Sequence, residues 1–219
     1  MQELQYIELE TNPNPTAAVI WLHGLGASGH DFEPVVPELG LPEGAAVRFI
    51  FPHAPNMPVT INGGMTMPAW YDIKAMDIDR IVDTDQLMAS SDAVAKLVDR
   101  ETERGVKSEN IIIAGFSQGG AVAYELGLSY PKRLGGIVAL STYFATAKTV
   151  SVSDANRGIP ISIYHGTHDP MVPESLGRLS VEKLKELGFD PSYRTFPMEH
   201  SVCLEEVQDI GGFIRKHVL

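Results

Sequence analysis

The sequence predicts an α/β protein in which a mostly parallel sheet carries helices on both faces. Short runs of apolar, often β-branched residues indicate strands that are buried on both sides. Segments of helical length separate these runs, and strands that alternate with helices build βαβ units. The 219 residues, of which 44% are hydrophobic and 21% charged, fit one globular domain spanning residues 1–219.

Each element has its own signal in the chain. Strands are predicted at residues 4–10 (an edge strand), 17–22, 47–51, 111–114, 135–140, 159–164 and 193–196. Helices are predicted at residues 31–39, 84–104, 121–129, 174–187 and from 201 onward, where apolar residues recur at helical spacing. Residues 56–79 show neither pattern and read as a long irregular segment. A segment of this length predicts a lid or a pocket wall.

Composition disfavours several classes of protein. The formal net charge is −11 and no basic cluster is present, so we expect no binding to nucleic acid. A single cysteine, Cys203, excludes an internal disulfide framework. No apolar run approaches the roughly 20 residues of a spanning helix, so no stable membrane insertion is expected. The first residues lack the features of a signal peptide, which predicts a cytoplasmic protein.

The strand at 111–114 runs into a motif that favours a nucleophile. Residues 115–119 read Gly-Phe-Ser-Gln-Gly, the G-x-S-x-G pattern, and a helix follows at once. Such a sharp turn strains its central residue, while Gly115 and Gly119 let strand and helix cross closely. The motif therefore predicts Ser117 as an exposed nucleophile at the carboxyl edge of the sheet. The alternative is an ordinary Gly-Ser turn.

A serine nucleophile needs a base and a carboxylate that orients this base. In G-x-S-x-G enzymes these partners follow the serine in the order acid, then histidine. His200 comes directly after the last predicted strand and Asp169 after the preceding one, and the carboxyl ends of parallel strands meet at one edge. His217 lies within the terminal helix and does not fit. We therefore predict His200 as the base and Asp169 as the acid.

Other polar residues nearby allow competing interpretations. His165 and His168 are three residues apart and lie just before Asp169, which could suggest a metal site, but they lack the further spaced ligands that zinc needs. We interpret both as loop histidines with local hydrogen bonds and predict no metal. Cys203 is predicted in the first turn of a helix without an elbow, so a packing role is favoured over a nucleophilic one.

Acyl transfer also needs two N–H donors for the oxyanion. We predict the backbone amides of Gln118, next to the nucleophile, and of Leu25 in the loop 23–26. This loop has a competing interpretation, because residues 24–29 match the G-x-G-x-x-G fingerprint of nicotinamide dinucleotide binding. That fingerprint requires an acidic residue at the end of the next strand, and residues 50–53 contain none. We therefore predict no cofactor.

Together the motifs resemble those of a known family. They are LHGLG at 22–26, PHAP at 52–55, VTINGG at 59–64, MPAWYD at 67–72, GFSQGG at 115–120, HG at 165–166 with Asp169, VP at 172–173 and HS at 200–201. The chain resembles the small single-domain carboxylesterases of the α/β-hydrolase fold, which include acyl-protein thioesterases and lysophospholipases. The resemblance implies a fold without a separate cap domain. It also implies Ser117, Asp169 and His200 as the catalytic residues, and Leu25 and Gln118 as the oxyanion donors.

The resemblance further implies that residues 67–71 form a wall of an acyl groove. Leu25, Trp70, Met171 and Val172 are the predicted substrate-binding residues, in an apolar slot for short or medium acyl chains. An alternative for Trp70 is an aromatic side chain that covers the sheet edge.

Three positions depart from the family pattern. Ala27 stands where the family usually has Asp, Thr142 where it has Gly, and Glu199 where it has Gly. We expect Ala27 and Thr142 to change loop packing near the pocket, and Glu199 to add negative charge beside the predicted base.

The sequence thus predicts a serine carboxylesterase that forms and then hydrolyses an acyl-enzyme. The expected partner is a small ester or thioester substrate. Two alternatives remain open: an acyl-protein thioesterase or lysophospholipase with the same chemistry, and a non-catalytic protein of this fold that only binds a small ligand. Some members of the family pair as dimers, so a homodimer is also expected.

Overall fold

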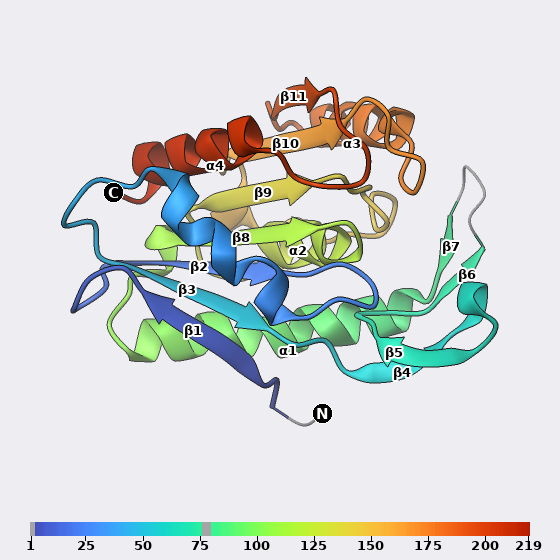
Figure 1. Cartoon of the computed structure of the whole chain (residues 1–219), viewed down its shortest axis with the longest axis horizontal. Helices are drawn as coiled ribbons and strands as arrows, with labels where there is room; N and C mark the ends of the chain where they lie inside the picture. The colour runs from blue at the N-terminus through green and yellow to red at the C-terminus, as the bar shows by residue number, and fades with distance from the viewer. Residues whose placement is uncertain (1–2, 76–79) are drawn as a thin grey trace.

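The computed structural model describes residues 3–75 and 80–219. A seven-stranded sheet lies at its centre, in the strand order β1-β3-β2-β8-β9-β10-β11 (Figure 1). Its strands are β1 (Tyr6–Glu10), β2 (Ala17–Leu22), β3 (Val47–Pro52), β8 (Ile111–Phe116), β9 (Gly136–Leu140), β10 (Ile161–Gly166) and β11 (Ser192–Phe196). Only the edge strand β1 runs antiparallel to its neighbour, and every other pairing in this sheet is parallel. The predicted mostly parallel sheet is confirmed.

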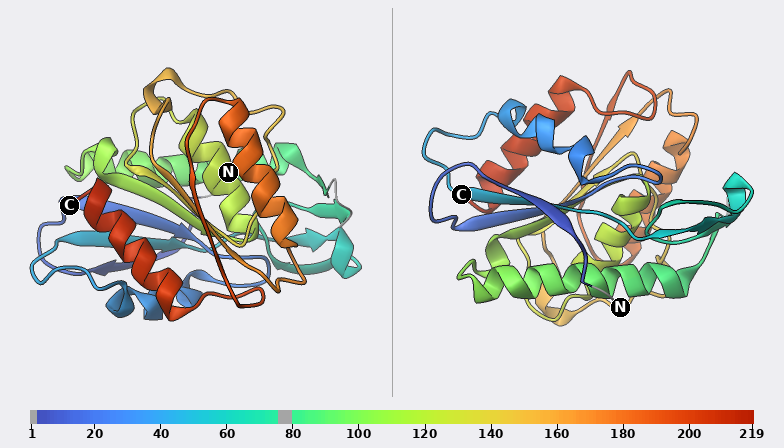
Figure 2. Two further views of the ribbon diagram at one scale, coloured as in Figure 1. Left: turned by 90° about the horizontal axis from the view of Figure 1, so that it is seen from above. Right: turned by 60° about the horizontal axis from the view of Figure 1, so that its bottom comes forward.

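Helices cover both faces of this sheet. They are α1 (Thr84–Glu103), α2 (Gln118–Ser129), α3 (Glu174–Glu186) and α4 (Leu204–His217). In β2 the side chains of Ala18, Ile20 and Leu22 join the core under α1 and α2, whereas the alternate residues face α4. Because successive strand residues point to opposite faces, both sets must be apolar. Figure 2 shows α1 and α4 on opposite sides of the sheet.

Two helical predictions need correction. Residues 31–39 were expected to form one helix, but two 3₁₀-helices lie here, η1 (Gly29–Asp31) and η2 (Glu33–Leu39). Pro34 and Pro37 lack the N–H that an α-helix would use, which favours these short, tight turns. The terminal helix begins at Leu204 rather than at Ser201, because Cys203 still has an extended backbone. The loop that carries His200 is therefore longer than expected.

The segment expected to be irregular contains two small hairpins. Strand β4 (Asn56–Val59) pairs with β5 (Met65–Pro68), and β6 (Ile73–Ala75) pairs with β7 (Ile81–Val82). Gly63 and Gly64 have φ values of 67° and 77°, and these left-handed conformations allow the chain to reverse after η3 (Thr60–Asn62). The expectation of an irregular segment is therefore wrong for residues 56–75, while residues 76–79 lie outside the described part.

A buried carboxyl group lies in the first turn of α4. Glu206 is fully buried, and neither of its side-chain oxygens has a hydrogen-bond partner among residues 3–75 and 80–219. Burial penalises the ionised form and raises the pKa of Glu206 to about 8. The folded protein therefore keeps a proton at Glu206 that the unfolded chain releases in mildly acidic solution.

This proton makes stability depend on pH. Because the pKa of Glu206 is raised in the folded state, the stability linked to its proton is lost as the pH rises from 4.5 to about 8. We expect Glu206→Gln, which cannot ionise, to unfold at a higher temperature than wild type at pH 9 and to lose this advantage near pH 4.5. Thermal unfolding measured across this range tests the prediction. Parallel curves for the two proteins would contradict it.

Candidate active site

Ser117 occupies the turn between β8 and α2. Its backbone has φ 53° and ψ −119°, a strained conformation for a residue with a side chain. A Cβ on Gly115 would lie 2.3 Å from the carbonyl oxygen of Gly119, and one on Gly119 would lie 2.6 Å from the carbonyl oxygens of Leu22 and His23. Only glycine fits at these two positions, so the motif creates the sharp elbow that the sequence predicts.

The strained serine backbone is held by hydrogen bonds from the neighbouring loop. The N–H of Ser117 donates to the carbonyl of Leu140 at 2.8 Å. Its carbonyl accepts from Gly120 N at 3.0 Å and from Thr142 Oγ1 at 2.5 Å. Thr142 also fills the space in which a Cβ on Gly120 would lie. This departure from the family pattern therefore fixes the elbow through a contact that glycine at 142 could not make.

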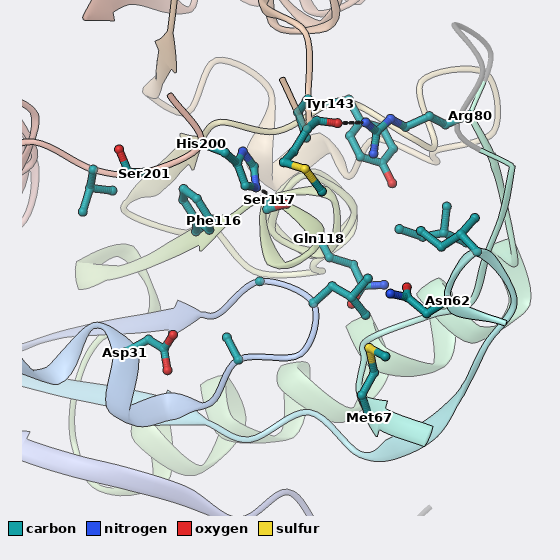
Figure 3. Close-up of a pocket in the computed structure, with 18 of the residues that line it drawn as sticks. Asp31, Asn62, Met67, Arg80, Phe116, Ser117, Gln118, Tyr143, His200 and Ser201 are labelled. Atoms are coloured by element: carbon teal, nitrogen blue, oxygen red, sulfur yellow. Dashed lines mark hydrogen bonds between the residues drawn. The ribbon is translucent and has the colours of Figure 1, made fainter. Parts of the chain in front are cut away.

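The structure brings Ser117, His200 and Asp169 together in one chain of hydrogen bonds. His200 Nε2 lies 2.9 Å from Ser117 Oγ, and His200 Nδ1 lies 2.6 Å from Asp169 Oδ2 (Figure 3 shows the first contact). An ionised carboxylate can only accept, so Nδ1 carries the proton and Nε2 is free to accept one from the serine hydroxyl. This is the arrangement that activates a serine nucleophile.

The environment of Asp169 keeps its carboxyl group ionised. Burial by itself would raise the pKa of Asp169, but hydrogen bonds from His200, Val172 and Met171 outweigh burial and lower it. The two backbone donors reach Asp169 Oδ1 at 2.9 Å from Met171 N and 2.8 Å from Val172 N. One carboxylate oxygen is thus fixed by the chain turn while the other is left for His200.

The two histidines beside Asp169 have other contacts. His165 is buried, and its Nε2 donates to the carbonyl of Val172 at 2.8 Å. Burial lowers the pKa of His165, so its ring is neutral and supports the turn that carries Asp169. His168 Nδ1 lies 3.3 Å from Thr167 Oγ1. Among the described residues, no group of three or more His, Cys, Asp or Glu side chains is placed to hold a metal ion.

The loop 23–26 is fixed by a buried histidine. His23 Nε2 accepts from Ala54 N at 3.0 Å, so its proton sits on Nδ1, which donates to the carbonyl of Gly24 at 2.7 Å. Burial lowers the pKa of His23, which fits this neutral form. The N–H of Gly26 donates to Pro68 O at 2.8 Å. Both ends of the loop are therefore anchored.

The two predicted oxyanion donors line the same cavity as Ser117. Within residues 3–75 and 80–219, neither the backbone N–H of Leu25 nor that of Gln118 has a hydrogen-bond acceptor in the fold. Gln118 is the first residue of α2, where N–H groups have no partner within the helix. Both amides are thus available to a substrate oxygen.

Trp70 does not line this cavity, which corrects its assignment to the substrate pocket. Its side chain is fully buried, and its Nε1 donates to the carbonyl of His23 at 2.8 Å. Its backbone N–H donates to Gln118 Oε1 at 2.8 Å, and Gln118 Nε2 donates to the carbonyl of Tyr71 at 2.5 Å. Trp70 therefore links the loop 23–26 to the elbow from behind.

A cavity of about 720 Å³ surrounds Ser117 and His200. Of the predicted substrate-binding residues, Leu25, Met171 and Val172 line it, as does Met67 from the predicted groove wall. Sequence reasoning missed further lining residues, among them Asp31, Phe32, Ile61, Asn62, Ile73, Arg80, Phe116 and Tyr143. Ile61 and Ile73 belong to the segment expected to form a pocket wall. Arg80 and Tyr143 carry no motif that could have identified them.

Figure 3 shows how the cavity is divided about the serine. Asp31 and Ser201 lie on one side of Ser117, and Met67 and Arg80 lie on the other. The first side is walled by aromatic packing, with the ring of Phe116 4.6 Å from that of His200 and 5.7 Å from that of Phe32.

Comparison with known proteins identifies the family. The chain matches the family described as Phospholipase/Carboxylesterase over residues 5–218. The protein belongs to this family of hydrolases. Two similar relatives are both called acyl-protein thioesterase 1. The one from Gibberella zeae is 40% identical over 93% of this chain and 91% of its own, and the one from Neurospora crassa is 38% identical over 93% and 87%.

Solved structures agree with the fold. Arabidopsis thaliana SOBER1 superimposes with a TM-score of 0.86 at 31% identity, covering 93% of this chain and 99% of that one. Acyl-protein thioesterase 2 of Zea mays has a TM-score of 0.86 at 25% identity, covering 98% and 99%. The fold is the α/β-hydrolase fold that the sequence predicts. Among the described residues, no helix is both long and apolar enough to cross a membrane.

The close approach at the elbow can be tested with a matched pair of glycines. We expect Gly119→Ala to lower the free energy of unfolding by about 2 kcal/mol or more, because its Cβ would collide with backbone. Gly212→Ala, in helix α4, meets only an arginine side chain at 3.6 Å and should raise stability by about 0.5 kcal/mol. Urea unfolding measures both. Equal effects of the two substitutions would contradict the steric role of Gly119.

Proposed function

We propose that this protein is a serine hydrolase that cleaves acyl thioesters and, by the same chemistry, carboxylic esters. The observation that carries the proposal is the hydrogen-bonded chain from Ser117 through His200 to Asp169, which opens into the cavity. We propose these three as the catalytic residues within a single domain spanning residues 1–219. A protein that only bound a ligand would have no need of this chain.

The reaction follows from the hydrogen bonds. Ser117 Oγ attacks the acyl carbonyl while His200 Nε2 takes its proton, and the ionised Asp169 stabilises the resulting imidazolium. His200 then gives this proton to the leaving thiol or alcohol, which leaves an acyl-enzyme. Water, deprotonated by His200 in its turn, releases the carboxylic acid. The backbone amides of Leu25 and Gln118 donate to the oxyanion in both halves of the reaction.

The thioester is favoured by the relatives. Three curated relatives, between 36% and 40% identical over more than nine-tenths of this chain, are called acyl-protein thioesterase 1. They support the thioesterase alternative more directly than the broader carboxylesterase interpretation. The apolar part of the cavity, with Leu25, Met67, Ile73 and Val172, suits an acyl chain.

Removal of the nucleophile tests the proposal. We expect Ser117→Ala to lower kcat for octanoyl thioester hydrolysis by roughly 10⁴-fold or more, because no other group can form the acyl-enzyme. Ser129→Ala, at the far end of the same helix, serves as the matched control and should retain wild-type rates. Release of free thiol is measured, with p-nitrophenyl octanoate run in parallel to compare ester and thioester. A folded Ser117→Ala protein with wild-type turnover would rule out the mechanism.

The role of Asp169 can be tested separately. Asp169→Asn still accepts from Met171 N and Val172 N, so the turn should fold. Its amide can donate to His200 Nδ1, however, which would move the imidazole proton to Nε2 and block the base. We expect kcat to fall by roughly 10⁴-fold, the size of effect that this substitution has in serine proteases. A loss of less than tenfold would show that Asp169 does not set the tautomer.

A further inference from the structure

A second cavity adjoins the first at its Arg80 end. It has a volume of about 400 Å³, and both Arg80 and Tyr143 line the two cavities. The remaining wall of this second cavity has an apolar part, with Val82, Phe144, Ala145, Leu176 and Leu179, and a polar part, with Thr84, Lys148, Ser180 and Lys183. Because both cavities are lined by Arg80 and Tyr143, these two side chains form the partition between them.

The two shared side chains differ in how firmly they are held. Tyr143 is buried, its hydroxyl lies 2.8 Å from that of Tyr71, and its ring packs with Val172 and Leu176. Arg80 is only half-buried. Its guanidinium donates to the carbonyl of Met171 and lies 4.8 Å from the centre of the Tyr143 ring (Figure 3).

Arg80 is therefore the movable part of the partition. Its Nε is buried without a hydrogen-bond partner among the residues that the structure describes, and none of the ion pairs found there involves Arg80. Among the described residues, the Met171 carbonyl and the stacked Tyr143 ring hold the guanidinium, and such contacts are weaker than a bidentate carboxylate. If the long side chain swings out, its guanidinium exchanges these contacts for water.

We infer that Arg80 is a gate between the two cavities and that the second cavity receives the distal end of acyl chains too long for the first. The inference rests on the proposed hydrolysis of acyl groups at Ser117. Arg80 would then determine which acyl-chain lengths the enzyme accepts. It would do so by controlling access to the second cavity, and it would take no part in the reaction at Ser117.

The direction of the acyl chain follows from the position of the base. His200 must protonate the leaving group, so the leaving group departs on the side of His200 and Phe116. The acyl chain then extends to the other side of Ser117, along Met67 toward Arg80 (Figure 3). Beyond Arg80, within the part of the chain that the structure describes, the second cavity offers a long chain further burial.

The experiment compares acyl chains of increasing length. Butanoyl, octanoyl, dodecanoyl and hexadecanoyl esters of p-nitrophenol are hydrolysed below their aggregation concentrations by wild type and variants. Each methylene that becomes buried should raise kcat/KM by up to about fourfold. Arg80→Ala should raise kcat/KM for the two long esters by about tenfold relative to its value for the butanoyl ester. Arg157→Ala, an exposed arginine paired with Asp154, controls for the loss of a positive charge.

Substitutions that fill the second cavity should lower kcat/KM for the long esters, in contrast to Arg80→Ala. Leu179 lines the second cavity but not the first, and it is 40% exposed on α3, so tryptophan can be accommodated there. Leu179→Trp should lower kcat/KM for the long esters by about tenfold, spare the butanoyl ester, and cancel the gain of Arg80→Ala in the double variant. Ala147→Leu, at a half-buried position of the same cavity, is the second filling variant.

Several outcomes would overturn the gate. The first is an unchanged kcat/KM for the long esters in both Leu179→Trp and Ala147→Leu. The second is an equal decrease of kcat/KM at every chain length in Arg80→Ala. The third is a wild-type preference for acyl chains that end in a carboxylate, if Arg80→Ala abolishes this preference. The last result would assign Arg80 to an anionic group instead.

A second readout separates the gate from the proposed function. Calorimetry measures butanoate and dodecanoate binding to Ser117→Ala proteins, with and without Leu179→Trp. Weaker binding of dodecanoate alone in the filled variant supports the second cavity even if wild type hydrolyses no ester. Equal dodecanoate binding by both proteins overturns it, whatever the esterase activity.

Discussion

The site depends on how closely β8, α2 and β2 cross. Gly115 and Gly119 bring backbone against backbone at distances that no Cβ permits, and this crossing drives Ser117 into a positive φ. A strained conformation persists only where its surroundings over-determine it. Here the surroundings are the Leu140 carbonyl, which accepts from the Ser117 N–H, and the Thr142 hydroxyl, which donates to the Ser117 carbonyl. The exposed hydroxyl is thus a consequence of the packing behind it, to which the Thr142 side chain contributes.

The same crossing couples the nucleophile to a segment far away in the chain. Gln118 directly follows the serine, and its side-chain amide forms hydrogen bonds with the backbone of Trp70 and Tyr71. The indole N–H of Trp70 in turn donates to the carbonyl of His23. The elbow, the loop 23–26 and the hairpin segment are therefore one hydrogen-bonded unit. Such a unit fixes the two available amides relative to the serine before any substrate arrives, which is what electrostatic stabilisation of an oxyanion requires.

Much of this could be predicted from the sequence, for a definite reason. Parallel strands end at one edge of a sheet, so a serine, an aspartate and a histidine placed after successive strands must converge, and the structure brings Ser117, Asp169 and His200 into contact. Trp70 shows the limit: an aromatic residue in a pocket-forming segment looks the same in sequence whether it faces the cavity or the core behind it. Arg80 and Tyr143 are far apart in the sequence but in contact in the structure, and no local sequence pattern predicts such a contact. The homodimer and the cytoplasmic location stay predictions.

Burial and hydrogen bonding explain why Asp169 stays ionised at the site while two buried histidines stay neutral. His23, His165 and Asp169 are all withdrawn from water, and in each case desolvation disfavours the charged form. For the two histidines this effect prevails and leaves neutral rings that support loops. For Asp169 desolvation does not prevail, because two backbone amides and His200 donate hydrogen bonds to its carboxylate and lower its pKa. The inner part of the site therefore presents one fixed negative charge to His200, and the ring that meets this charge is the one poised to take the proton of Ser117.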